Sequence, residues 1–291
     1  MSAPQKLSQA IPAPPPDLGA GVKGQAAEPH PAGRIKHGLS VQVLRMLLMA
    51  TWFHTVVFSV HATQLLGSPL YLINKNFFYA YMALTKQSFG LLITTTTAWF
   101  SPTIIRVSGD ESVRGQLLQT EDGRLETDFP ERLILIANHQ IYTDWLYLWW
   151  VAYTNRMHGH IYIILKESLK YIPVVGPGMM FYGFIFMARN WEKDRSRLHH
   201  RLQVLNKGSH GGPMSGSQHL DPMWLMIFPE GTNLSENTQN NVSAKWAKKQ
   251  GIPNLEHQIL PRSKGLEFCL QELKGTVDWV YDCTVAYEGI P

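Results

Sequence analysis

Two long apolar stretches open the patterned part of the chain. The first runs from Val43 to Ile73 and the second from Phe77 to Phe100, with the polar residues Asn74-Lys75-Asn76 between them. At about 1.5 Å per helical residue, each stretch is long enough to cross or enter a bilayer. The pattern predicts a membrane-anchoring helical hairpin over residues 38–105, in which the first stretch is the better spanning candidate. Two core helices of a soluble protein have the same pattern, and this alternative is open.

Farther along, apolar runs of strand length alternate with stretches that suit helices. This alternation is typical of an α/β sheet with helices packed on its faces. We therefore expect a mixed sheet flanked by helices in a domain that covers residues 106–291. The predicted strands are Leu133–Ala137, Ile161–Leu165, Gly183–Ala188, Trp224–Phe228 and Val280–Tyr287.

Polar segments separate these runs. Residues 1–37 are rich in Pro, Ala, Gly and Gln, a composition that predicts a disordered tail. Thr103–Val107 has the pattern of a short strand, and Gly109–Arg132 is expected to be an exposed connection. Asn206–Asp221 is expected to be a flexible loop, because Gly, Ser and Pro dominate it.

Composition narrows the class of protein. Only 16% of residues are charged, 11% are aromatic and nine are Trp, which favours contact with a membrane. A net charge of +4 fits an anionic partner such as phospholipid headgroups or a phosphorylated cofactor. Nucleic acid is not expected, because no basic run or basic helix face occurs. The two cysteines, Cys269 and Cys283, provide neither a disulfide framework nor a thiolate zinc cluster, so no metal is expected. Nothing in the sequence names a protein partner.

His139 and Asp144 follow the aliphatic run LILIA. A neutral imidazole can take the proton of an attacking hydroxyl, while a carboxylate on its other nitrogen fixes the tautomer. The spacing alone is weak support, since a chance H-x4-D in a chain with 12 His is about as likely as not. The position at a strand end favours a catalytic pair. A buried His that caps a turn is the alternative.

The segment Phe228-Pro229-Glu230-Gly231-Thr232 also follows an apolar run. Pro ends the strand, Gly allows a ligand close to the backbone, and Thr232 or Ser235 is a candidate helix cap. Glu230 is placed to hold a substrate hydroxyl. An ordinary strand-to-helix turn with an exposed Glu is the alternative.

Three cationic residues are expected near the same edge of the sheet as His139 and Glu230. Arg189 ends GFIFMAR, Lys166 follows IYIIL, and Arg262 lies in LPRSKG. A guanidinium at a sheet edge can bind a phosphate through two hydrogen bonds. Ligands of open α/β sheets gather at the carboxyl ends of strands, which favours a shared site over scattered surface charges. Four aromatic residues are expected to face either an acyl slot and the bilayer interface or the core: Tyr142, Trp145, Trp149 and Trp150.

These segments together resemble the glycerophospholipid acyltransferase family, which includes the lysophosphatidic acid acyltransferases. NHQIYTD is similar to the family's N-H-x4-D block, GFIFMAR to its G-x-I-F-x-x-R block and FPEGT to its third block, in the family's order. KESLKYIPVVG is similar to the segment between the first two blocks. PRSKG, VAYEG and GFIFMARNWEKDR look most like the lysocardiolipin and lysophosphatidylinositol acyltransferase branch, in a fungal form. The resemblance covers about residues 40–291.

The resemblance implies roles for these residues. His139 would be the general base and Asp144 its orienting partner. Glu230, Gly231 and Thr232 would line the acceptor site, while Lys166 and Arg189 would hold the phosphate of a lysophospholipid. Acyl-CoA would be the donor substrate, with no bound cofactor, and the endoplasmic reticulum membrane the location.

One position departs from the family pattern. Many members have Arg after F-P-E-G-T, whereas this chain has Asn233. Either a phosphate contact is lost or Arg262 replaces it, which would suit a phosphodiester headgroup better than a phosphomonoester. VAYEGIP ends directly after a predicted strand while relatives continue, so a trimmed or partial sequence is expected.

Two other functions are open. One is a catalytically silent membrane scaffold or lipid-binding protein with the same fold, against which the intact His139–Asp144 pair and FPEGT argue. The other is a CoA-independent transacylase that moves acyl chains between phospholipids.

Overall fold

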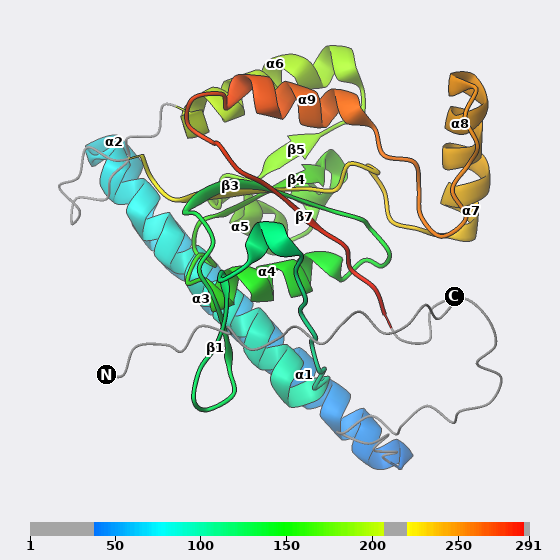
Figure 1. Cartoon of the computed structure of the whole chain (residues 1–291). Helices are drawn as coiled ribbons and strands as arrows, with labels where there is room; N and C mark the ends of the chain where they lie inside the picture. The colour runs from blue at the N-terminus through cyan, green and yellow to red at the C-terminus, as the bar shows by residue number, and fades with distance from the viewer. Residues whose placement is uncertain (1–37, 207–219, 288–291) are drawn as a thin grey trace. The chain divides into compact units, whose positions relative to one another are not determined.

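The computed structural model describes residues 38–206 and 220–287 (Figure 1). The predicted disorder of residues 1–37 and most of the predicted loop at 206–221 lie outside the described residues. Contacts divide the chain into two units. The smaller contains residues 38–55 and 92–129, and the larger contains residues 56–91 and the described residues from 130 onward.

The two apolar stretches form helices α1 (Leu39–Gly67), α2 (Leu70–Ile73) and α3 (Lys75–Phe100). Leu39–Ile73 has a mean hydropathy of 1.6, and only 6% of its most apolar window is buried. Among the described helices, it alone is long and apolar enough to cross a membrane. The predicted spanning candidate therefore agrees with the structure in length and composition.

Helices α1 and α3 pack as the expected hairpin. In the larger unit, the Tyr81 hydroxyl donates to the Thr63 carbonyl at 3.0 Å, and the buried Gln64 donates to the Thr85 hydroxyl at 3.5 Å. In the smaller unit, the Arg45 guanidinium donates to the Phe100 carbonyl at 3.0 Å. Residues close to the hinge contact each other, and a residue far from the hinge on α1 contacts one far from it at the end of α3, as an antiparallel pair requires.

The core of the larger unit is a five-stranded sheet in the order β5-β4-β6-β3-β7. All described pairings in this sheet are parallel. Parallel strands need crossover connections, and helices supply them here. The expected α/β class, a sheet flanked by helices, is confirmed. The strands are β3 (Arg132–Ala137), β4 (Ile161–Lys166), β5 (Ile185–Met187), β6 (Met223–Ile227) and β7 (Val280–Cys283).

The central strands β3 and β6 are apolar on both sides because helices cover both faces of the sheet (Figure 1). One face packs against α6 (Trp191–Asn206) and α9 (Ser263–Glu272), through a core that includes Ile134, Leu202 and Leu225. The other side holds α4 (Asp144–Thr154) and α5 (Val175–Phe181).

The aromatic residues near α4 divide between core and surface. Trp149 is buried, donates to the His158 carbonyl at 3.0 Å and packs edge-on against Phe89 and Phe184. Core packing, the second of the two expectations, therefore holds for Trp149. Tyr142 is 79% exposed and packs into no core.

The polar connection before the sheet differs from its prediction. Thr103–Val107 forms no strand, so that prediction is wrong. The stretch expected to be an exposed connection instead contains an antiparallel hairpin of β1 (Leu117–Gln119) and β2 (Leu125–Thr127). Its turn places Gly123 at φ 79°, a conformation that Asp-Gly pairs favour in hairpins.

Shorter elements complete the described chain. The strand predicted at Gly183–Ala188 is shorter, because Gly183 has φ 75° and the chain bends at Arg189, which has φ 64°. The remaining elements are the 3-10 helices η1 (Glu111–Val113) and η2 (Glu167–Tyr171), helix α7 (Glu236–Thr238), the π-helix η3 (Gln239–Ser243) and helix α8 (Ala244–Gln250).

Candidate active site

The carboxyl ends of the five parallel strands lie at one edge of the sheet. The register pairs Lys166 with Met187, Ile136 with Ile227, and Ala137 with Cys283, so each strand ends at a similar level. In strand order, the residues that lie at or follow these ends are Arg189, Lys166, Glu230, His139 and Tyr287. The parallel sheet therefore brings the segments carrying the predicted site residues to one edge.

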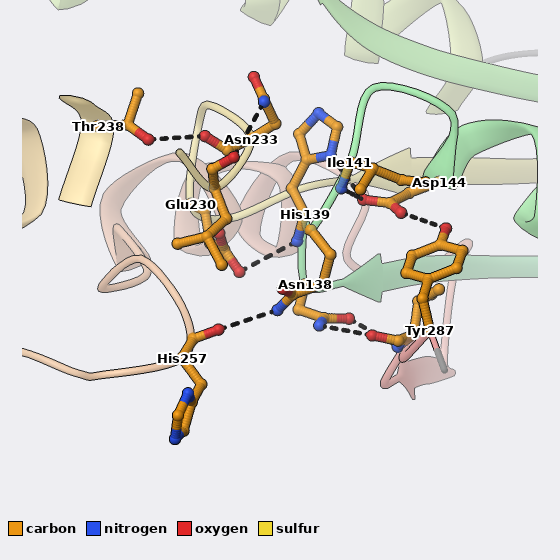
Figure 2. Close-up of polar contacts among 12 residues, drawn as sticks. Asn138, His139, Ile141, Asp144, Glu230, Asn233, Thr238, His257 and Tyr287 are labelled. Atoms are coloured by element: carbon orange, nitrogen blue, oxygen red, sulfur yellow. Dashed lines mark hydrogen bonds and ion pairs between the residues drawn. The ribbon is translucent and has the colours of Figure 1, made fainter. Parts of the chain in front are cut away.

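His139 and Asp144 form a hydrogen-bonded pair at this edge (Figure 2). The His139 Nδ1 atom lies 2.8 Å from Asp144 Oδ2, and the same oxygen accepts the Ile141 N–H at 3.0 Å. The Asp144 side chain is fully buried, whereas that of His139 is 18% exposed. When Nδ1 carries the proton and donates to the carboxylate, Nε2 has the free lone pair that a general base needs.

Tyr287 completes the environment of the buried carboxylate. Its hydroxyl donates to Asp144 Oδ1 at 2.5 Å, so both carboxylate oxygens accept hydrogen bonds (Figure 2). Burial, followed by the bond to Asp144, raises the pKa of Tyr287, so this hydroxyl stays protonated and acts as a donor.

Asn138 explains how Tyr287 reaches this position. Its side-chain amide donates to the Val285 carbonyl at 2.9 Å, and its side-chain oxygen accepts the Val285 N–H at 2.7 Å. These two bonds continue the pairing of β3 with the chain beyond β7. Tyr287 comes two residues later, so it lies on the same side of the extended segment as Val285.

Glu230 holds the backbone of His139. Its Oε1 atom accepts the His139 N–H at 3.1 Å, and the His139 carbonyl accepts the Leu234 N–H at 2.7 Å. The side chain is buried, so the alternative of an exposed Glu in an ordinary turn is wrong. Burial raises the pKa of Glu230, although the bond from His139 opposes the shift. The second oxygen, Oε2, is buried with no hydrogen-bond partner among the described residues.

The turn around Glu230 also shapes the ring contacts of His139. Phe228 stacks on the imidazole, with ring centres 4.3 Å apart and an interplanar angle of 26°. Gly231 follows Glu230 with φ 73°, a conformation that side chains other than Gly rarely adopt. Of the two candidate caps, Ser235 accepts the Thr238 N–H at the start of α7, while Thr232 is half-buried beside Gly231.

The three predicted cations lie near the same edge with their charged groups accessible. Lys166 and Arg189 are exposed at the ends of β4 and β5. With strands about 4.8 Å apart, these backbones lie about 10 and 14 Å from that of His139, distances that long side chains can shorten. Arg262 is joined to the turn through its N–H, which donates to the Pro229 carbonyl at 2.8 Å.

Arg189 has an unusual backbone conformation, with φ 64°. The buried carboxylate of Asp194 accepts the N–H groups of the residues on either side, Ala188 at 2.8 Å and Asn190 at 2.9 Å. A non-glycine residue keeps such a conformation only where its surroundings fix it, and this occurs often at ligand sites.

Sequence reasoning found the segments of this site but missed several residues. Tyr287 is expected only as the last residue of a strand and as part of VAYEG, and the sequence assigns no role to Asn138 or Phe228. An aromatic hydroxyl in a motif after the last strand was the available signal for Tyr287. The general-base, acceptor and phosphate roles of the predicted residues stay predictions.

A histidine oriented by a buried carboxylate at the carboxyl edge of a parallel sheet, with cations nearby, suits acyl transfer to the hydroxyl of a phosphorylated acceptor. The family profile for "Acyltransferase" matches residues 105–288. The chain belongs to the Acyltransferase family, as the sequence motifs predicted.

Three relatives show which members of the family the chain is similar to. It is 38% identical over 226 residues to an uncharacterized acyltransferase of Schizosaccharomyces pombe, covering 78% of this chain and 61% of that protein. It is 36% identical over 231 residues to a 2-acyl-1-lysophosphatidylinositol acyltransferase of Saccharomyces cerevisiae, covering 71% and 58%. It is 35% identical over 164 residues to lysocardiolipin acyltransferase 1 of Danio rerio, covering 55% and 39%.

The matched part of the chain thus spans about three fifths of the length of the first two relatives. No solved structure matches the chain. The predicted resemblance to this branch, with fungal relatives, is confirmed.

Proposed function

We propose that this protein is an O-acyltransferase that moves a fatty acyl chain from acyl-CoA to the free hydroxyl of a lysophospholipid. The observation that carries the proposal is the bond between His139 Nδ1 and the fully buried carboxylate of Asp144. His139 Nε2 takes the hydroxyl proton as the oxygen attacks the thioester carbonyl. The C–S bond then breaks, an ester forms, and the departing thiolate receives the proton from His139.

Direct transfer is favoured over an acyl-enzyme intermediate. Burial raises the pKa of Cys269 to about 12 and that of Cys283 to about 11, so both thiols stay protonated and weakly nucleophilic. A positioned base that activates the acceptor hydroxyl makes a protein nucleophile unnecessary.

The acceptor is proposed to be a lysophospholipid held by its phosphate. Lys166 and Arg189, exposed at neighbouring strand ends, would bind the phosphate oxygens, and the fixed backbone of Arg189 supports this role. Glu230, Gly231 and Thr232 would line the acceptor pocket. The Leu39–Ile73 helix would hold the protein in a membrane, and we propose the endoplasmic reticulum membrane.

Headgroup choice is proposed to depend on Asn233 and Arg262. The hydrogen bond from Arg262 to Pro229 keeps residue 262 beside the FPEGT turn, which supports Arg262 in place of the arginine missing at position 233. One guanidinium in that place suits a phosphodiester, as in lysophosphatidylinositol or lysocardiolipin. The relatives named above for these two lipids support that choice.

The first experiment measures acyl transfer by the full chain in membranes, with and without labelled acyl-CoA, across a panel of lysolipids. Label should appear in phospholipid only when acyl-CoA is supplied. Product without acyl-CoA would instead identify a CoA-independent transacylase. A protein that binds lysolipid but forms no product would fit the silent scaffold.

The second experiment separates acceptor binding from chemistry. Arg189→Gln should raise KM for the phosphorylated acceptor several-fold with a smaller change in kcat. Arg195→Gln removes the same charge from an exposed position on α6 and serves as the matched control. An unchanged KM in Arg189→Gln would count against the phosphate contact.

For headgroup choice, Arg262→Gln should raise KM for lysophosphatidylinositol, whereas Lys264→Gln, two residues away and also exposed, should leave KM unchanged. Asn233→Arg should shift preference toward lysophosphatidic acid. Equal effects of Arg262→Gln and Lys264→Gln would argue against a specific role for Arg262.

A further inference from the structure

A cavity opens at the amino ends of the strands, on the edge of the sheet opposite His139. It lies among residues of α3, α5 and α6 and the first residues of β3, β4 and β6. Its volume is about 60 Å³. One water needs about 10–15 Å³ on the same scale, so the cavity has room for a few waters or a small oxyanion.

Lys86 of α3 brings a buried positive group to this cavity. The residue is 2% exposed, and its Nζ atom donates to the Ile161 carbonyl at 2.8 Å. The ammonium also lies 3.9 Å from the centre of the Tyr162 ring. A second ring, that of Phe184, lies farther away at 5.8 Å. The carbonyl is the one hydrogen-bond acceptor of this ammonium among the described residues, and the group has three donors. No carboxylate pairs with Lys86 in the described part of the chain.

Arg201 of α6 brings a second cation. An added Cβ at Gly183 would lie 3.4 Å from Arg201 Nη2, so the guanidinium lies close to the backbone of the cavity wall. Within residues 38–206 and 220–287, its side chain has neither a hydrogen bond nor an ion pair. A guanidinium carries five donors, and leaving them unused in a half-buried position is unfavourable unless water or a ligand accepts them.

Arg132, also at the cavity, needs no ligand. Its guanidinium donates to the carbonyls of Thr276, Leu205 and Asp221. The single carboxylate of the lining is Asp221, and burial raises its pKa to about 6, with Arg132 opposing the shift. Burial and the nearby Arg201 lower the pKa of Lys86 to about 7, so near neutral pH part of the lysine is uncharged. Three basic groups nevertheless face one carboxylate, so the lining keeps an excess of positive charge even with Asp221 ionised.

We propose that this cavity is a second anion site, in which the Lys86 ammonium and the Arg201 guanidinium hold a phosphate-type oxyanion. A guanidinium offers two parallel donors to such a group, and an ammonium adds a point charge on another side. The oxyanion is either free phosphate or the headgroup of an anionic lipid. Since α3, α6 and β4 all contribute, the bound ion ties these three elements together.

The site is separate from the proposed acceptor contact. Arg189 follows the carboxyl end of β5, whereas Arg201 lies farther along α6 at the cavity by the amino ends. Binding can therefore be measured after the acceptor contact is removed, so the test does not depend on catalysis.

The experiment measures thermal unfolding of the purified full chain in detergent micelles, with inorganic phosphate compared with chloride at equal ionic strength. The protein carries Arg189→Gln to remove the acceptor contact. At a phosphate concentration about five times the dissociation constant, the midpoint should rise by about 2–4 °C. Adding Arg201→Gln should abolish the rise, whereas adding Arg195→Gln, the same charge loss on an exposed part of α6, should preserve it.

A second arm identifies the source of the oxyanion. Micelles doped with phosphatidic acid are compared with micelles doped with diacylglycerol of the same chains. An Arg201-dependent rise with phosphatidic acid, at a concentration where inorganic phosphate gives none, assigns the site to a lipid headgroup. An Arg201-dependent rise with inorganic phosphate assigns it to a free phosphate. If neither probe raises the midpoint, or if Arg201→Gln leaves the rise unchanged, the proposal is overturned.

Discussion

The two edges of the same sheet differ in how fully their polar side chains are hydrogen-bonded. At the carboxyl edge, His139, Asp144 and Tyr287 form a chain of hydrogen bonds in which both oxygens of the buried carboxylate are used. At the amino edge, Lys86 has one hydrogen-bond acceptor, and Arg201 has no partner among the described residues. The first arrangement fixes the orientation of its side chains, and the second leaves donors unused among the described residues.

Two arginines at the amino edge show the same contrast between neighbours. Arg132 uses its guanidinium on three backbone carbonyls, which fixes the chain where β3 begins. Arg201 lines the same cavity without such bonds. Residue type therefore does not distinguish a structural cation from a binding cation. The partners of each donor do.

The largest effect should come from His139→Ala, which removes the proposed base at the carboxyl edge. Acyl transfer should fall by about 10²–10⁴-fold in kcat, the usual contribution of general-base catalysis. Initial rates with labelled acyl-CoA measure the change. His200→Ala, an exposed histidine on α6, is the matched control and should retain activity. Parental activity in His139→Ala would show that another group takes the proton.

Arg132→Met should destabilise the protein more than Arg201→Gln. It strips hydrogen bonds from three carbonyls, which predicts a loss of about 2–4 kcal/mol in the free energy of unfolding. Arg201→Gln should cost less than about 0.5 kcal/mol without phosphate. Chemical denaturation in micelles measures both. Equal losses of unfolding free energy in the two variants would show that Arg132 is no more important for stability than Arg201.

Tyr287→Phe should produce a smaller catalytic loss than His139→Ala. One hydrogen bond to Asp144 is worth about 0.5–1.5 kcal/mol, which predicts a fall of about two- to tenfold in kcat with KM unchanged. Tyr147→Phe is the control, because its ring packs 5.6 Å from that of Tyr287. A rise in KM with kcat unchanged would assign Tyr287 to substrate binding instead.

For Asp221→Asn the expected effect appears in the pH dependence of stability rather than in activity. The folded-state pKa of about 6 lies above the unfolded value of about 3.9, so folding favours the protonated carboxyl. The stability from this group is fully present below about pH 4 and is lost as pH rises through about 6. In Asp221→Asn, the thermal unfolding midpoint should change less with pH across this range than it does in the parent protein. An unchanged slope would mean that another group titrates there.

Local patterns in the sequence predicted much of the fold. Five apolar runs became the five strands of the sheet, because short aliphatic segments between helical patterns have few other ways to be buried. The strand ends then placed the predicted site residues at one edge. The prediction at Thr103–Val107 was wrong because pattern alone does not show whether a partner strand exists. The hairpin of β1 and β2 was missed because each of its strands is only three residues long and no long apolar run marks it.

Contacts between residues far apart in the chain could not be predicted from the sequence. Tyr287 lies 143 positions after Asp144, and it reaches the carboxylate only through the pairing of Asn138 with Val285. Lys86 and Arg201 lie on different helices, and their unused donors are visible only once every neighbour is known. The motif at His139 and Asp144 was predictable because its two residues are only five positions apart, so local chain is enough to form it.

The pairing of Asn138 with Val285 restricts the number of residues between β7 and Tyr287 rather than the side chain at position 285. The carboxamide binds only backbone atoms at position 285, so many side chains can occupy that position without loss of the two bonds. One residue inserted between 285 and 287 would turn the tyrosine to the opposite side of the extended segment. Positions 285 and 286 can therefore vary in side chain, but the number of residues before Tyr287 cannot change.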